Sequence, residues 1–176
     1  MRIEKQLTDN RFLNLKEVQD PDNNVRGYQF AERLGVDSVA FILYDHNTKE
    51  YMFNKEYKPP VNQFILGAFG GSMDKDKTPI EIVIGEVKEE AGFVVTEDNI
   101  NDLGKVLVST QMNQFCHLFL VKVDKNDQDE REPENAIEAM AETKWVSWNS
   151  EIISRIEDWK PLAIILKAEH KGILSA

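Results

Sequence analysis

The segment of residues 70–93 constrains the fold more than any other part of this chain. It begins with two glycines and passes through an acidic, lysine-containing turn into a stretch with clear helix boundaries. Thr78 can serve as the N-cap, Pro79 occupies the first helical position, and Glu81 lies three residues after the cap, which together form a capping box. Gly92 accepts the left-handed conformation that ends many helices. The pattern therefore predicts a helix from Pro79 to the residue before Gly92.

The two faces of this predicted helix differ in chemistry. At about 100° per residue, its apolar side chains fall on one arc that we expect to be buried; they are Ile80, Val83, Ile84, Val87 and Ala91. Glu86, Glu89 and Glu90 fall on another arc, where like charges at i and i+4 destabilise a helix. A hard divalent cation such as Mg²⁺ or Mn²⁺ converts that repulsion into coordination. The preceding glycine allows close backbone approach, so the carbonyl of Gly70 is a further candidate metal ligand. A solvated Glu/Lys face is the alternative.

This segment resembles the Nudix box, in which a glycine and a loop precede a helix that carries Arg-Glu-hydrophobic-x-Glu-Glu-x-Gly-hydrophobic. The residues in register are Gly71, Glu86, Val87, Glu89, Glu90, Gly92 and Phe93. Two positions depart from the pattern: Lys77 replaces a loop glutamate, and Gly85 replaces the helix arginine. In the family these two residues pair and help to orient the carboxylates. Either Lys77 supplies the missing positive charge and the chemistry is retained, or the domain binds a nucleotide without cleaving it efficiently.

Length and composition indicate one ordinary globular domain. The chain has 176 residues, of which 41% are hydrophobic and 30% are charged. Its net charge of -10 argues against nonspecific binding to nucleic acid or to an acidic membrane. The single cysteine, Cys116, excludes an intrachain disulfide and lies in an apolar run that favours burial. The sequence shows no signal peptide and no transmembrane segment, so we expect no membrane partner and a cytoplasmic protein.

Residues 1–35 are predicted to form an N-terminal hairpin. A strong turn signal spans residues 20–24, and residues 25–33 have the character of a returning strand. This start resembles the N-terminal extension of the ADP-sugar pyrophosphatase branch of the Nudix family. The resemblance implies a homodimer built with this hairpin and places Tyr28 where an aromatic side chain stacks on adenine. An ordinary strand aromatic is the alternative. The Nudix domain then spans residues 36–176.

The segment just before the box also resembles this branch. Lys58 stands where an arginine is common, so it is a candidate for contact with a substrate phosphate or ribose, with a plain surface lysine as the alternative. Gly71 is assigned to the substrate loop. Gly67 replaces a glutamate that the branch uses for the sugar, so a different nucleoside diphosphate derivative is an alternative substrate.

The rest of the chain is predicted to alternate between strands and helices. Apolar runs predict strands at residues 36–44, 50–54, 64–68, 100–109, 117–123 and 144–148, a helix over about 149–158 and another from Pro161. The acidic stretch 124–142 reads as a solvated loop. Nudix enzymes often take a further glutamate from this region, and the candidates are Glu134, Glu138 and Glu142. Glu142 is preferred because it directly precedes the last strand.

The resemblance covers most of the chain and implies an α/β fold: a Nudix α/β/α sandwich with a mixed sheet and an N-terminal β-hairpin extension. It also implies metal-dependent hydrolysis of the diphosphate in ADP-ribose or a related nucleotide sugar, which releases AMP and a sugar phosphate. Glu86, Glu89 and Glu90 then hold Mg²⁺ or Mn²⁺, and Glu89 and Glu142 are the expected catalytic residues. The alternatives are a nucleotide-binding regulatory module and a Nudix hydrolase of another substrate.

Overall fold

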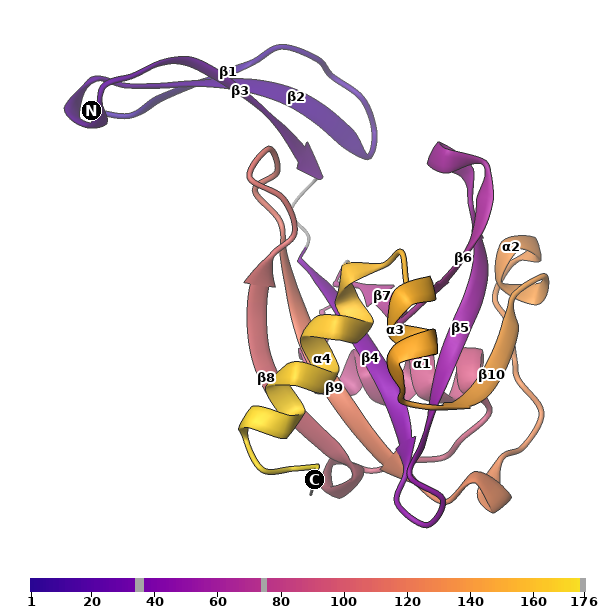
Figure 1. Ribbon diagram of the computed structural model, residues 1–176. Coiled ribbons are helices and arrows are strands. Elements are labelled where there is room, and N and C mark those ends of the chain that lie inside the picture. The colour runs from indigo at the N-terminus through magenta and orange to yellow at the C-terminus, as the bar shows by residue number, and fades with distance from the viewer. Residues whose placement is uncertain (34–36, 74–75, 175–176) are drawn as a thin grey trace.

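The computed structural model describes residues 1–33, 37–73 and 76–174, which form two sheets (Figure 1). The first is a three-stranded sheet of β1 (Ile3–Gln6), β2 (Leu13–Asp20) and β3 (Val25–Arg33). The second is a seven-stranded sheet of β4 (Ser38–Asp45), β5 (Glu50–Lys58), β6 (Gln63–Gly67), β7 (Phe69–Ser72), β8 (Ile100–Leu107), β9 (Phe115–Val123) and β10 (Glu142–Ser147). The helices are α1 (Pro79–Glu86), a π-helical turn η3 (Val87–Ala91), α2 (Ala136–Ala139), α3 (Ser150–Arg155) and α4 (Trp159–His170).

The larger sheet is mixed and lies between helices. Its main path runs β10-β5-β4-β9-β8, with β6 paired to β5 and β7 paired to β4. Strand β4 runs parallel to β9, whereas its pairings with β5 and β7 are antiparallel. Parallel neighbours need a crossover connection, and here the chain between β4 and β9 passes through α1. This crossover places α1 against one face of the sheet.

Strand β4 separates two hydrophobic cores because its side chains alternate between the two faces. Val39 and Phe41 pack with the buried side chains of α1. Ala40 and Ile42 pack instead with the buried side chains of α4. The two helices therefore cover opposite faces of the sheet, as Figure 1 shows. This burial on both sides explains the continuous apolar run in the sequence of β4.

Helix α1 and the π-helical turn η3 together have the boundaries that the sequence predicts. The Thr78 hydroxyl accepts a hydrogen bond from the Glu81 amide at 3.3 Å, and the Thr78 amide donates to the Glu81 carboxylate at 2.7 Å. Gly92 ends the helical segment with φ +75°. The π-helical geometry of the final turn was not predicted. Of the predicted buried arc, Val83, Val87 and Ala91 are fully buried, whereas Ile80 and Ile84 are partly buried.

The N-terminal extension has one more strand than the predicted hairpin. The hairpin is β2 and β3, and β1 adds a third strand along β2. Its four residues are all exposed, so no alternation of apolar side chains marked this strand in the sequence. Residues 34–36, which contain the predicted boundary between the extension and the domain, lie outside the described part of the chain.

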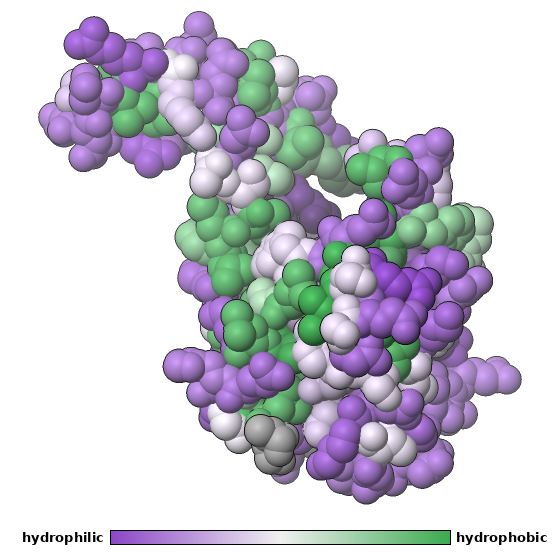
Figure 2. Space-filling model, in the orientation of Figure 1, coloured by the Kyte–Doolittle hydropathy of each residue, from purple (hydrophilic) through white to green (hydrophobic). Residues whose placement is uncertain are grey.

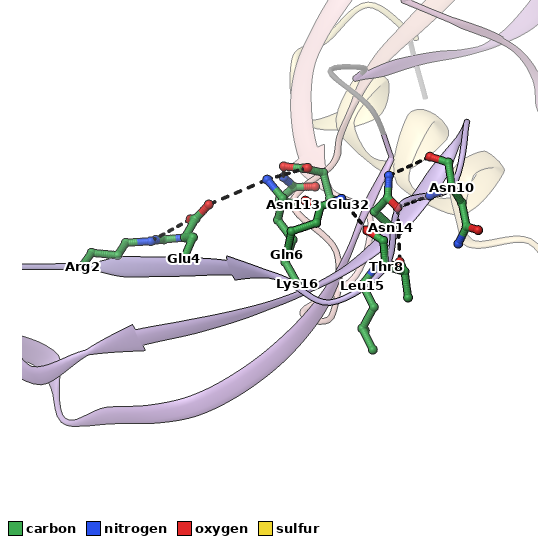
Figure 3. Close-up of polar contacts among 10 residues, drawn as sticks. All are labelled: Arg2, Glu4, Gln6, Thr8, Asn10, Asn14, Leu15, Lys16, Glu32 and Asn113. Carbon is green, nitrogen blue, oxygen red and sulfur yellow. Dashed lines mark hydrogen bonds and ion pairs between the residues drawn. The ribbon is translucent and has the colours of Figure 1, made fainter.

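Polar contacts stabilise the extension because its own core is small. Val18 and Phe30 are its buried apolar side chains. Figure 3 shows the polar groups, including an ion pair of 2.6 Å between Lys16 and Glu32. The buried Asn14 accepts a hydrogen bond from the Asn10 amide at 2.6 Å. Figure 2 shows that the extension projects from the body and has a largely hydrophilic surface with hydrophobic patches.

The extension contacts the body at the loop between β8 and β9. The Ala31 amide donates to the Gln111 carbonyl at 2.8 Å, and the Asn113 side chain donates to the Glu32 carboxylate at 2.9 Å (Figure 3). The Tyr28 hydroxyl donates to the Thr110 carbonyl at 2.9 Å. This loop is therefore tied to β3 along its length.

Several predicted element limits shift by a few residues. Strand β5 continues to Lys58, and the strand predicted from residue 144 begins at Glu142. The last helix begins at Trp159 instead of Pro161, because the Asp158 side chain accepts a hydrogen bond from the Lys160 amide and forms the N-cap. None of the helices among residues 1–33, 37–73 and 76–174 is long and apolar enough to cross a membrane.

Candidate functional site

A cleft of about 510 Å³ lies beside β7 and the first residues of β4 and β9, between the start of α4 and the charged face of α1. Most residues proposed from the sequence line it. They are Lys58, Gly70, Gly71, Lys77, Glu86, Glu89 and Glu90. Arg33, Glu56, Glu134, Glu138, Trp159 and Lys160 also line it. Tyr28 and Glu142, which were proposed as well, do not line this cleft.

Glu90 is the most deeply placed of the three helix glutamates. Its residue is 8% exposed, and its carboxylate accepts a hydrogen bond from the Gly70 amide at 3.3 Å. Burial, and secondly the neighbouring charge of Glu86, raise the pKa of Glu90 to about 8. Both effects disfavour the ionised carboxylate. A positive charge in the cleft would favour it.

The glycine loop lies directly against Glu86. A Cβ atom built on Gly71 would overlap the Glu86 carboxylate and would be only 2.9 Å from its Cγ. At Gly70, a Cβ atom would lie 2.7 Å from the Val39 carbonyl of the neighbouring strand. Any larger residue at these two positions would displace the strand or the carboxylate. The glycines therefore let α1 and β7 approach closely enough to share the cleft.

The two departures from the Nudix box are both at the cleft. Lys77 is exposed and lines the cleft, as does Gly85. A Cβ atom on Gly85 would have one neighbour within 4 Å among the described residues, the Glu89 carboxylate at 3.9 Å. A close approach of another group would explain a glycine inside a helix, but the described residues make no such approach to Gly85. The position has room for a side chain.

The acidic stretch brings two of its three candidate glutamates to the cleft. Short helix α2 begins after the N-cap Asn135, and the Glu134 amide donates to the Glu138 carboxylate at 2.8 Å. Both glutamates line the cleft, and the charge of Glu138 adds to the effects that raise the pKa of Glu90. Glu142 pairs with Lys55 on the neighbouring strand at 3.5 Å, and its side chain is 73% exposed. Its strand position thus directs it away from the cleft that it was expected to serve.

Three further charged groups at the cleft were missed in the sequence: Glu56, Arg33 and Lys160. Glu56 lies two positions before Lys58 on β5, and the two side chains form an ion pair of 2.7 Å. The two-residue period of a strand could have revealed this neighbour. Arg33, at the end of β3, donates to the Ser72 hydroxyl at 2.6 Å. No local pattern connects Arg33 with the glycine loop, because the two are brought together by tertiary contact.

The chemistry of the cleft fits a hard divalent cation. Its carboxylates belong to the oxygen-ligand class that Mg²⁺ and Mn²⁺ prefer, and Glu90 and Glu86 repel each other when both are ionised. Among the residues that the structure describes, no three His, Cys, Asp or Glu side chains converge closely enough to form a complete metal site. The candidate ligands thus lie in one cleft and on one helical segment, but their side chains do not converge on a single point.

Comparison with known proteins finds a relative in sequence and a relative in structure. No protein-family model matches the chain. An uncharacterised Nudix hydrolase of Schizosaccharomyces pombe is 23% identical over 141 residues, which cover 74% of this chain and 67% of the relative. The crystal structure of an ADP compounds hydrolase superposes with a TM-score of 0.72 and 16% identity, covering 99% of this chain and 95% of that one. This likeness confirms the predicted fold class, an α/β sandwich of the Nudix type with a mixed sheet.

Proposed function

We propose that this protein is a Nudix hydrolase that cleaves the diphosphate of ADP-ribose or a related nucleotide sugar, releasing AMP and a sugar phosphate. The observation that carries the proposal is the placement of Glu86, Glu89 and Glu90 with the glycine loop in one cleft. The S. pombe relative supports a Nudix hydrolase, and the similarity to an ADP compounds hydrolase supports an ADP-containing substrate.

Cations and carboxylates share the cleft, as cleavage of an anionic substrate requires. Glu86, Glu89, Glu90 and the Gly70 carbonyl are the proposed ligands of Mg²⁺ or Mn²⁺, which supplies charge neutralisation and a more acidic water when bound. Lys58, Lys77 and Arg33 line the same cleft and are placed to bind phosphate oxygens. Gly71 keeps the loop small enough for the substrate to approach.

The reaction needs a base that takes a proton from the attacking water. Water then forms a bond to one phosphorus, and the bond from that phosphorus to the bridging oxygen breaks, so the other phosphate leaves. We assign the base to Glu138 instead of Glu142, because Glu138 lines the cleft and Glu142 points away from it. Glu89 is the second candidate for this role.

The experiment is a measurement of AMP release from ADP-ribose with Mg²⁺ or Mn²⁺. We expect release by the unmodified protein and loss of at least tenfold in Glu89→Gln, Glu90→Gln and Glu138→Gln, as for groups that act on the reacting atoms. Glu142→Gln is the matched control and should retain activity. Equal losses in Glu138→Gln and Glu142→Gln would contradict the assignment of the base.

The second candidate function is a nucleotide-binding regulatory module. The vacant side-chain position at Gly85 favours it, since among the described residues only the Glu89 carboxylate lies within 4 Å of a Cβ atom there. ADP-ribose would then raise the melting temperature without releasing AMP. Conversely, if Lys77 replaces the arginine, Lys77→Ala should lower turnover by about tenfold or more, as losses of orienting partners do. A panel of nucleotide substrates separates ADP-sugar hydrolysis from hydrolysis of other nucleoside diphosphate derivatives.

We also propose a homodimer in which the extension contacts the second copy. The cleft of one chain does not include its own Tyr28, which supports a role for Tyr28 at the cleft of a second copy. Sedimentation equilibrium of the full chain and of Tyr28→Ala measures the assembly, and the nucleotide affinity of the variant measures the contact. A monomer with full nucleotide affinity would contradict this part of the proposal.

A further inference from the structure

One part of the cleft is lined by apolar, aromatic and amide side chains that the cleavage of a diphosphate does not use. The acidic lining comes largely from α1 and the turn η3 that follows it, on one face of the sheet, and from the acidic stretch. On the other face, the cleft is lined by the start of α4 together with the residues that flank the β8–β9 loop. These residues are Val108, Gln114, Cys116, Trp159 and Lys160. This part of the cleft is apolar and cationic, with an aromatic ring and an amide.

Trp159 is an exposed aromatic side chain at this position. It is 37% exposed although it lines the cleft, whereas Trp148 stacks on Phe53 in the core and Trp145 packs edge-on against Phe93. No aromatic ring among the described residues stacks on Trp159, and its recorded ring contact is with the Lys160 ammonium, 5.8 Å from the ring centroid. The indole is available to a planar ligand.

Asp158 fixes the first turn of α4, which carries this indole. Its side chain is 9% exposed, pairs with Lys160 at 2.9 Å and accepts a hydrogen bond from the Ala68 amide at 3.3 Å. A Cβ atom on Gly67 would lie only 2.5 Å from the Asp158 carboxylate. The glycine that replaces the sugar-specific glutamate of the ADP-sugar branch therefore makes room for Asp158. This fastens the first turn of α4, and Trp159 with it, to the strand that leads into the glycine loop.

Gln114 provides a polar group beside the aromatic one. The residue is only 6% exposed, yet it lines the cleft. Its carbonyl accepts a hydrogen bond from the Val108 amide at 3.0 Å, while no hydrogen bond to its side-chain amide is found in the part of the chain that the structure describes. The preceding residue, Asn113, is tied to Glu32 of the extension. Its side-chain amide is open to the cleft, where it can bond to a ligand.

Trp159 and Gln114 are brought to the same region by neighbouring elements. Cys116 lies two residues after Gln114 and lines the cleft with both of them. Burial raises the pKa of the Cys116 thiol, and the charges of Lys160 and Asp158 also act on it, so the start of β9 lies near the start of α4. Trp159 and Gln114 therefore line one cleft on neighbouring elements.

We propose that Trp159 and Gln114 form a subsite for the base of the nucleotide substrate. The indole stacks on the face of the base, which every nucleobase offers. The Gln114 amide, with one acceptor and two donors, bonds to the edge of the base, and an amide of this kind matches the adjacent donor and acceptor of adenine. The inference deepens the proposed function, on which it rests, by assigning the residues that select the nucleotide.

The test uses AMP as the probe with the metal-free full chain, so that no turnover is needed. AMP should change the tryptophan fluorescence of the unmodified protein and of the control Trp148→Phe, and should leave that of Trp159→Phe unchanged. By calorimetry, Trp159→Leu and Gln114→Leu should each bind AMP about tenfold or more weakly, the scale of a lost base–aromatic contact. Ribose 5-phosphate, which has no base, should bind all variants equally.

The outcomes separate this inference from the proposed hydrolysis. If ADP-ribose is not cleaved but AMP binding depends on Trp159 and Gln114, the hydrolysis proposal fails and the base subsite stands. If ADP-ribose is cleaved while both variants bind AMP as tightly as the unmodified protein, the base subsite is overturned. Loss of AMP binding in Tyr28→Ala, with full binding in Trp159→Leu, would place the base on the extension of a second copy and would also overturn it. Unchanged thermal melting of the variants excludes a folding defect.

Discussion

Replacing Glu90 with glutamine should stabilise the metal-free protein, and increasingly so at higher pH. The carboxylate is nine-tenths buried beside Glu86, and its pKa in the folded protein is raised to about 8, compared with 4.5 for an unperturbed glutamate. Glutamine has nearly the same shape and keeps an oxygen that accepts the hydrogen bond from the Gly70 amide. The substitution therefore removes the charge with little change in packing.

The direction of this pH effect follows from the order in which the unfolded and the folded protein lose the Glu90 proton. As pH rises, the unfolded chain releases the Glu90 proton near pH 4.5, whereas the folded protein keeps it until about pH 8. The unfolded state thus binds fewer protons across this range, and the free energy of unfolding falls as pH increases. The Glu90 contribution is favourable below about pH 4.5 and is lost progressively up to about pH 8.

The size of the pH effect follows from the two pKa values of Glu90, about 8 in the folded protein and 4.5 in the unfolded chain. Each pH unit between them changes the free energy of unfolding by about 1.4 kcal/mol. Between about pH 5.5 and about pH 8.5, the stability advantage of Glu90→Gln should therefore grow by roughly 3 kcal/mol. Groups shared by the variant and the unmodified protein cancel in this difference.

Urea unfolding at the two pH values, in the presence of a chelator, measures the effect. Glu97→Gln is the matched control, because it makes the same substitution at an exposed position. Added Mg²⁺ should stabilise the unmodified protein more than Glu90→Gln, because the variant lacks a proposed ligand. The same stability difference at both pH values would refute the argument that burial and Glu86 hold this carboxylate protonated.

Three further predictions concern stability and reactivity. Gly92→Ala should lower the free energy of unfolding by about 2 kcal/mol or more, since the residue has φ +75° and its Cβ would overlap the Asp129 carbonyl. Gly85→Ala should instead raise the free energy of unfolding by up to about 1 kcal/mol. Chemical denaturation measures both, and equal effects would contradict the geometry. Thr78→Ala should lower the free energy of unfolding by about 1 kcal/mol through loss of the capping box, and an unchanged value would show that Pro79 alone starts the helix. The thiol of Cys116 is buried with a raised pKa, so a thiol reagent should react with it slowly until denaturant is added; fast labelling of the folded protein would contradict its burial.

Local chemistry explains what was predictable about the fold. The start of α1 depends on residues within four positions of one another, and so does the end of η3 at Gly92. Strand β4 was recognisable because both of its faces are buried, which demands an unbroken apolar run. Strand β1 was missed because none of its residues is buried, so its formation depends on pairing with β2.

The sequence by itself determined the capped helix, the spacing of Glu86, Glu89 and Glu90 along it, and the glycines that face them. Each of these follows from helix periodicity or from the space that a missing side chain leaves. The tertiary structure alone decided that Glu138 enters the cleft while Glu142 points away, that Glu90 has a raised pKa, and that Trp159 and Gln114 line the same cleft. These properties depend on burial and on charges or rings brought together from distant segments, and no pattern within one segment encodes such distances.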